Sequence, residues 1–231
     1  EDEMLNLRFH GHSCWELDDG THRVLIDPFL TGNPLADVEP GVFESLDAIV
    51  VTHGHGDHLG DSVEIAKRTG ALVVSNFEIV NWFGARECQG HPMHIGGGRQ
   101  FPFGHIKFTI AHHGSTGPDG EPLGNPMGVV LSMGGRKVYH AGDTGLFLDM
   151  QLIGEMSGPL DVALLPIGDN FTMGVDDAAK AAELLGARVN IPMHYDTFDV
   201  IQADPAEFVD KVGRTGGTAV IVKPGQSYEL P

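Results

Sequence analysis

The sequence predicts an α/β protein in which two β-sheets pack face to face and helices cover their outer sides. Three observations predict this fold class. Strand-like and helix-like segments alternate in both halves of the chain, no linker or low-complexity segment divides them, and 41% of the 231 residues are hydrophobic. This length fits one large domain or two small ones and supplies ample chain for a buried core.

The N-terminal half begins with antiparallel strands and continues as an alternation of strands and helices. Residues 5–9 alternate apolar and polar side chains, as a half-buried strand does. Gly11-His12-Ser13 interrupts this pattern, and the turn Asp18-Asp19-Gly20 joins the next two strands. The other elements predicted here are strands at 14–17, 23–26, 46–51 and 71–75, and helices at 61–68 and 77–84.

The C-terminal half repeats the alternation. A strand at 106–110 leads into Gly114–Pro126, a segment rich in glycine and proline that we expect to be a mobile lip beside the site. Alanines and Leu185 form the packing stripe of a helix that ends at Gly186. The other elements predicted here are strands at 127–131, 137–140, 161–167, 189–193 and 218–222, and helices at 147–156, 176–185 and 205–212.

Composition argues against several classes of function. The net charge is −18, and an acidic chain repels nucleic-acid backbones unless a basic patch overrides it. The sequence contains no such patch, because the pairs Lys67-Arg68 and Arg136-Lys137 are isolated, so we expect no nucleic-acid partner. No apolar run approaches the roughly 20 residues of a membrane helix, so we expect no membrane partner. An acidic N-terminus without signal-peptide features, together with only two cysteines, favours the cytoplasm.

The segment Thr52–His58 concentrates metal ligands at the end of a predicted strand. It holds three imidazoles and one carboxylate, separated by glycines, in the side chains of His53, His55, Asp57 and His58. Glycine has no Cβ, so the turn can fold tightly and direct its neighbours to a common point. Imidazole nitrogen and carboxylate oxygen suit Zn, Mn and Fe. The alternative is a histidine-rich surface turn, and the preceding strand and following helix argue against it.

One ion cannot easily use all four side chains of so short a loop. The natural division places His53 and His55 on one ion and Asp57 and His58 on a second, about 3.5–4 Å away. Asp27, at another strand end, either orients a ligand histidine through a hydrogen bond or makes a turn before proline.

Further ligands must come from later strand ends. The candidates are His112 or His113, then Asp143, then His194. Strand parity counted from Ile106 would direct His112 inward, although parity is unreliable where a strand ends.

This pattern resembles the metallo-β-lactamase-fold hydrolases, which carry H-x-H-x-D-H after a hydrophobic strand and further ligands at later strand ends. The resemblance implies a four-layer αββα sandwich forming a single domain over residues 1–231. It assigns His53, His55 and His113 to the first ion and Asp57, His58 and His194 to the second, with Asp143 as the bridge. The Ala-x-His-x-Ser spacing favours His113 over His112.

More specific motifs resemble the UPF0173 group of metal-dependent hydrolases, near the ascorbate-6-phosphate lactonase branch. They are Gly11-His12-Ser13, Ile26-Asp27-Pro28, residues 139–145, residues 166–174 and residues 192–195. The loop at 168–174 follows a strand at the same end as the ligands, so Asn170 and Thr172 are candidate substrate contacts. Their alternative role is to cap the helix at Asp176.

The resemblance implies a hydrolase with two divalent ions, Zn or Mn, with Fe as a further option. A bridging hydroxide would attack an ester, lactone or phosphodiester of a small anionic substrate, and Asp57 would orient it and handle a proton. The alternatives are an RNase Z-like nuclease and a non-catalytic metal-binding scaffold. Only 50 residues separate Asp143 from His194, which leaves no space for the insertion of a β-CASP nuclease. A homo-oligomer is compatible with the sequence.

Overall fold

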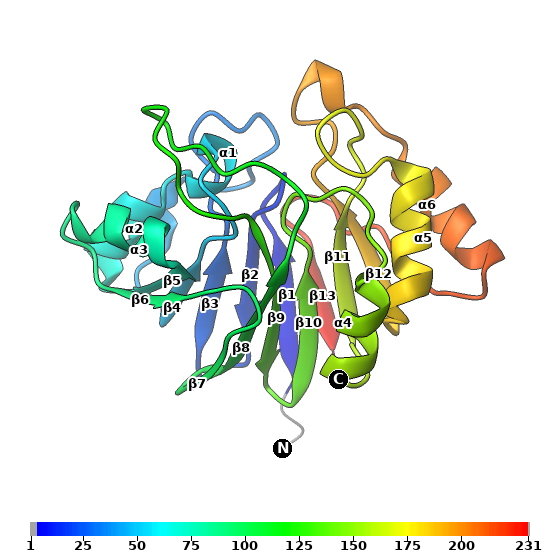
Figure 1. Cartoon of the computed structure of the whole chain (residues 1–231), viewed down its shortest axis with the longest axis horizontal. Coiled ribbons are helices and arrows are strands. Elements are labelled where there is room, and N and C mark those ends of the chain that lie inside the picture. Colours follow the sequence, from blue (N-terminus) through cyan, green and yellow to red (C-terminus); the bar gives the residue numbers. More distant parts are fainter. Residues whose placement is uncertain (1–3, 231) are drawn as a thin grey trace.

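A computed structural model describes residues 4–230, which form two β-sheets with helices on both outer sides (Figure 1). The first sheet contains β1 (Leu5–Phe9), β2 (Trp15–Asp18), β3 (Arg23–Ile26), β4 (Ala48–Val50), β5 (Leu72–Asn76), β6 (Gly90–Met93) and β13 (Ser227–Leu230). The second contains β7 (Gly98–Phe101), β8 (Gly104–Ile110), β9 (Met127–Met133), β10 (Arg136–His140), β11 (Val162–Pro166) and β12 (Val189–Met193). The helices are α1 (Gly56–Leu59), α2 (Ser62–Thr69), α3 (Phe77–Gly84), α4 (Met150–Ser157), α5 (Val175–Leu185) and α6 (Pro205–Arg214).

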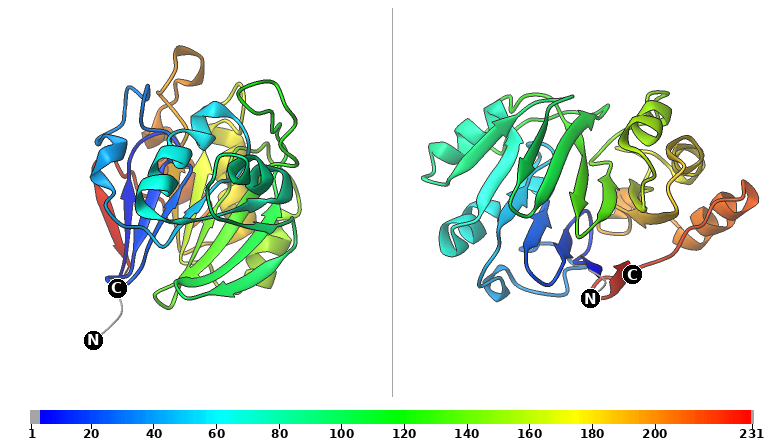
Figure 2. Two further views of the ribbon diagram at one scale, coloured as in Figure 1. Left: turned by 90° about the vertical axis from the view of Figure 1, so that its left-hand side faces the viewer. Right: turned by 90° about the horizontal axis from the view of Figure 1, so that it is seen from below.

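The strand order is β13-β1-β2-β3-β4-β5-β6 in the first sheet and β12-β11-β10-β9-β8-β7 in the second. Figure 2 shows the two sheets stacked, with helices flanking each of them. The predicted αββα sandwich is confirmed.

Alternating side chains along the central strands divide the interior into three cores. In β4, Val50 packs between the sheets, whereas Ile49 packs toward α2 and α3. In β11, Leu164 lies between the sheets and Leu165 lies under α4, α5 and α6. Both faces of these strands are buried, so the strands are apolar throughout rather than alternating with polar residues.

The α5 helix forms as the sequence predicts. Its alanine stripe and Leu185 are buried in the outer core of the second sheet. The helix ends at Gly186, which adopts φ +60 and so occupies a conformation that L side chains rarely adopt.

The prediction of a buried strand at residues 218–222 is wrong. This segment makes a single bridge, between Ala219 and Asn190, and Ile221 is exposed. Pro224, which lacks a backbone N–H, and a turn at Gly225 follow it. The last strand is instead β13, which pairs antiparallel with β1. The edge strands β6 and β7 were not predicted either, because their sequences lack apolar alternation.

The strand directions bring the predicted ligand positions to one edge of the sandwich. The strands β3, β4 and β5 are parallel, and so are β10, β11 and β12. Two antiparallel pairings through β9 make β8 run the same way as β10. The carboxyl ends of these strands therefore meet at one edge, drawn uppermost in Figure 1. Among residues 4–230, no helix combines the length and the apolar character needed to cross a membrane.

Candidate metal centre

The loop between β4 and α1 needs its glycine at position 54. A Cβ on Gly54 would lie 2.8 Å from the Cβ of Leu123, so a larger residue would push the neighbouring loop away. The amide of Gly54 donates to Ser115 Oγ at 3.0 Å. His53 and His55 project from either side of this glycine. The α1 helix then begins at Gly56 and carries Asp57 and His58.

The first group of candidate ligands consists of His53, His55 and His113. His55 Nδ1 lies 3.0 Å from His53 Nε2 and 3.2 Å from His113 Nε2. All three histidines could hold one ion. His112 lies elsewhere: its ring stacks on Phe147 with centroids 4.9 Å apart, and its backbone N–H donates to Thr144 Oγ1. The structure thus places His113, rather than His112, in the cluster.

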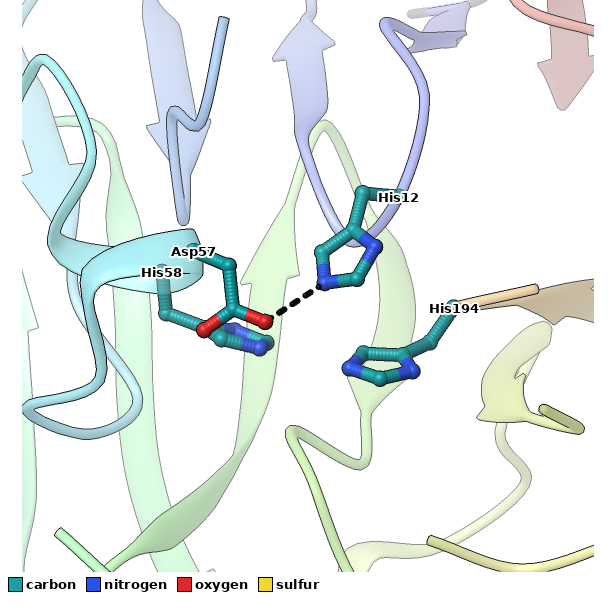
Figure 3. A group of neighbouring side chains, drawn as sticks. All are labelled: His12, Asp57, His58 and His194. Atoms are coloured by element: carbon teal, nitrogen blue, oxygen red, sulfur yellow. Dashed lines mark hydrogen bonds and ion pairs between the residues drawn. The ribbon is translucent and has the colours of Figure 1, made fainter. Parts of the chain in front are cut away.

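The second group contains Asp57, His58 and His194, together with His12. Figure 3 shows these side chains pointing toward one another from three segments: the β1–β2 turn, α1, which carries both Asp57 and His58, and the loop after β12. One ligand atom from each lies within 4.8 Å of the others. His194 follows β12 with φ +55, and its amide donates to the carbonyl of His12 at 2.7 Å.

Asp143 lies between the two groups. Its Oδ2 is 3.0 Å from His194 Nε2 and 3.4 Å from His113 Nε2, and its Oδ1 is 3.2 Å from His58 Nε2. The preceding residue must be glycine, because Gly142 adopts φ +62 and a Cβ there would lie 2.6 Å from the carbonyl oxygen of Met127. This backbone directs the Asp143 carboxylate into the space that both groups face.

Asp27 supports the second group from behind. Its Oδ2 accepts hydrogen bonds from His58 Nδ1 at 2.7 Å and from Thr52 Oγ1 at 2.6 Å, and its Oδ1 accepts from the Thr52 amide. Asp27 is fully buried. The Asp27–His58 hydrogen bond orients the His58 ring with Nε2 toward Asp143. The Asp27 side chain therefore has the first of the two roles that the sequence leaves open, which is to orient a histidine. Its backbone also makes a turn, because the Phe29 amide donates to the Asp27 carbonyl.

Burial and opposite charges set the protonation of the buried ligands. Burial lowers the pKa of His53 and of His113. Burial also opposes a charge on His58, yet Asp143 and Asp27 raise the pKa of this histidine well above its ordinary value. Asp143 is held ionised, because His194 and His58 outweigh burial and lower its pKa. A cation bound in the second group would have to displace a proton from His58, so we expect metal binding to strengthen as pH rises.

The buried ligand atoms fit a cation. Asp143 lies 3.0–3.2 Å from His58 Nε2 and His194 Nε2, yet neither of these nitrogens nor Asp143 Oδ1, all of them buried, has a hydrogen bond of acceptable geometry in the described part of the chain. Buried polar atoms are nearly always satisfied, so atoms left open in a converging group indicate a missing partner. Imidazole and carboxylate ligands without a thiolate suit Zn, Mn or Fe. The residues present therefore fit the divalent ions that the sequence predicts.

Asn170 and Thr172 lie in a loop beside Asp143. The amide of Met173 donates to the carbonyl of Thr144 at 3.0 Å, which holds the two loops together. Neither residue caps α5, whose N-cap is Gly174 and has no side-chain hydrogen bond. Asn170 is exposed, and the Thr172 hydroxyl donates to the Met173 carbonyl at 3.3 Å. Their contact with substrate stays a prediction.

The loop at Gly114–Pro126, which we expect to be a mobile lip, is held by hydrogen bonds at its base. Ser115 Oγ donates to the carbonyl of Leu123 at 2.9 Å, and the Leu123 amide donates to the Ser115 carbonyl at 2.8 Å. Asn76 Nδ2 donates to the Leu123 and Asn125 carbonyls. The sequence could not predict these bonds, because Asn76 is 47 and 49 residues away from its two partners.

We therefore expect uneven amide exchange along this loop. Exchange should be faster at the exposed tip, where the amides of Asp119 and Gly120 make only local hydrogen bonds within the turn, and slow at Leu123 and Gly54, whose amides are bonded to Ser115. Hydrogen–deuterium exchange of the ligand-free protein measures this difference. Ser115→Ala should speed exchange most at Gly54, whose amide loses its acceptor Oγ, and less at Leu123, whose amide keeps the backbone carbonyl of residue 115, whereas Ser132→Ala, on β9, should leave both unchanged. Uniform exchange from 114 to 126 would contradict the anchored base.

Similarity to known proteins agrees with this site. A family model described as a beta-lactamase superfamily domain matches residues 22–195. A UPF0173 metal-dependent hydrolase from Bacillus licheniformis is 48% identical over 231 residues, which covers 98% of this chain and 100% of that protein. Another from Heliobacterium modesticaldum is 48% identical over 234 residues and covers 98% of each.

A solved structure shows the same fold. Igni18, a metallo hydrolase from the hyperthermophilic archaeon Ignicoccus hospitalis, matches with a TM-score of 0.91 and 38% identity, covering 99% of both chains. Sequence identity near one half over essentially the whole length goes beyond a shared fold. The chain therefore belongs to the UPF0173 metal-dependent hydrolases of the β-lactamase superfamily.

Proposed function

We propose that this hydrolase uses two divalent ions, Zn or Mn or else Fe, to cleave an ester, lactone or phosphodiester of a small anionic substrate. The observation that carries the proposal is the position of Asp143 between two groups of ligands. Its carboxylate oxygens lie 3.0–3.4 Å from His194, His58 and His113, which come from both groups. A carboxylate so placed can serve two ions at once.

The side chains around the ions have distinct tasks. When bound, the two ions would supply a water-derived nucleophile at neutral pH and polarise the oxygen under attack. Asp57 is the one carboxylate of the group with a partly exposed side chain, at 28%, so it can reach both water and substrate. Burial opposes its ionisation, but the hydrogen bond with His12 and the charge of His58 hold its pKa well below the usual value. Asp57 therefore stays ionised and can orient a water molecule, whereas its low pKa makes it a weak base that takes up a proton only transiently.

The charge around the site favours a small anion over a polymer. Two divalent ions bring four positive charges, and Asp57, Asp143 and the nucleophile would offset about three of them. Five of the loops at this edge contain no lysine or arginine, namely 27–42, 113–126, 141–149, 167–174 and 194–204. The net charge of −18 repels a polyanion within a screening length of about 8–10 Å. A compact anion presents one or two charges to the ions and avoids most of this repulsion.

A paired assay tests the substrate class. Lactones, esters and phosphodiesters with a single anionic group are offered beside labelled RNA and single-stranded DNA, with Mn or Zn added. We expect metal-dependent hydrolysis of at least one small anion and none of the nucleic acids. Chelator-treated protein is the control. Cleavage of nucleic acid without activity on the small anions would establish the nuclease alternative, and metal binding without any turnover would favour a scaffold.

A further inference from the structure

His12 is a buried histidine at the second group of ligands, and the ligand assignment from the sequence leaves it without a role. It lies in the turn between β1 and β2 with φ +56 and is fully buried. Its ring packs on His194 with centroids 4.0 Å apart and touches the rings of Phe29 and Phe198, each 5.6 Å away. These neighbours enclose the ring on several sides.

Both ring nitrogens of His12 have a partner. Nε2 lies 3.2 Å from Asp57 Oδ2, and Nδ1 lies 2.8 Å from Thr197 Oγ1. Figure 3 shows the ring edge with Nε2 directed at the Asp57 carboxylate. These two contacts link segments 45 and 185 residues away in the chain.

The hydrogen-bonding capacity of the partners fixes where the proton of His12 lies. An ionised carboxylate only accepts, so Nε2 must carry the hydrogen that Asp57 receives. Nδ1 then carries no hydrogen, so it can accept a hydrogen bond from the Thr197 hydroxyl. The hydroxyl is much closer to His12 than to its other acceptor, the Tyr195 carbonyl at 3.4 Å, so it donates to the ring.

We propose that His12 is a positioning residue that holds the Asp57 carboxylate in one orientation, with Thr197 fixing the ring tautomer. The proposal rests on the role of Asp57 proposed above. Asp57 stands in the four-residue helix α1 with its side chain partly exposed, so few other contacts restrain it. The hydrogen bond from His12 engages Oδ2 and leaves Oδ1 free. Groups that orient a ligand carboxylate in this way typically change metal affinity about 10–100-fold when removed.

A second role for His12 is possible in the same place and predicts a different proton position. Its ligand atom lies within 4.8 Å of those of Asp57, His58 and His194, so Nε2 could bind the second ion directly. The proton would then be on Nδ1 and donated to Thr197. Nitrogen-15 NMR of the histidine rings distinguishes the two tautomers in the metal-free and in the zinc-loaded protein. We expect the proton on Nε2 in both.

Variants at His12 separate positioning from direct ligation. His12→Gln places an amide N–H where Nε2 was and can still donate to Asp57, whereas His12→Ala cannot. Affinity for each ion is measured by chelator competition with zinc. We expect His12→Ala to weaken the second ion about 10–100-fold and leave the first unchanged, and His12→Gln to restore most of the loss. Thr197→Val should weaken the second ion in the same direction, whereas His22→Gln, at a partly exposed histidine between β2 and β3, should have no effect.

Three results would overturn the proposal. A proton on Nδ1 in the zinc-loaded protein, with His12→Gln as damaging as His12→Ala, would make His12 a ligand. Unchanged affinity for the second ion in all His12 variants would leave it only a packing role. A mobile Asp57 side chain in the metal-free wild type, seen in its carboxyl carbon resonance, would remove the restraint itself. Because the tautomer is read without metal or substrate, a failure of the proposed hydrolysis would not be confused with a failure of this proposal.

Discussion

Asp57→Asn is expected to lower the turnover of any confirmed substrate by about 10²–10⁴-fold, the usual contribution of a general acid or base. The amide has the shape of the carboxylate and can still accept the hydrogen bond from His12, but it can neither take up a proton nor bring a negative charge. Asp57 belongs to the second group of ligands, whereas His53, His55 and His113 form the first. Affinity for the first ion should therefore change far less than turnover.

Steady-state kinetics and metal analysis of the same preparation measure both quantities. Asp119→Asn is the matched control, because Asp119 is an acidic residue on the nearby loop with a side chain 83% exposed. It should retain the turnover and the metal content of the wild type. Wild-type turnover in Asp57→Asn would show that the proposed mechanism is wrong.

The sequence predicts most of the fold because long apolar strands and an alanine-striped helix carry their own patterns. Val50 and Leu164 lie in runs that are apolar on both faces, and such runs form central strands of a covered sheet. Residues 218–222 are similarly apolar, but they pair with a neighbouring strand at only one position, Asn190. Composition alone does not tell whether a neighbouring strand is available, so the prediction fails there.

In the candidate site, too, residues that are close in sequence can be predicted, whereas contacts between distant segments cannot. His53, His55, Asp57 and His58 are close in sequence, and a tight turn that requires Gly54 brings them together. His12 has no local pattern of this kind. A single histidine in a strand interruption is usually structural, and its partners are distant in sequence: Asp57 follows β4 of the same sheet, and Thr197 follows β12 of the other sheet. The one available signal was the Gly11-His12-Ser13 motif of the family, which includes His12 but does not indicate its role.

Asp143→Asn is expected to reduce the metal content from two ions per chain to one at most and to abolish turnover. Asp143 lies within 3.0–3.4 Å of nitrogens from both groups, so loss of its charge affects both ions at once. It also leaves the positive charge of His58 with Asp27 as its remaining carboxylate partner, which makes entry of a second cation less favourable. Replacing a strand-end aspartate that contacts neither group of ligands would neither affect the two ions nor change the carboxylate partners of His58.

Elemental analysis after purification without chelator measures the metal content, and chelator competition gives the two affinities. The matched control is Asp169→Asn, because Asp169 follows β11 as Asp143 follows β10, and its φ of +57 suits asparagine. That variant should hold as many ions as the wild type. A bridging carboxylate requires two ions to bridge, so a wild-type protein that saturates at one ion would exclude this role for Asp143. An Asp143→Asn variant that still binds two ions with unchanged affinity would exclude it as well, because the shared charge would then contribute nothing to either ion.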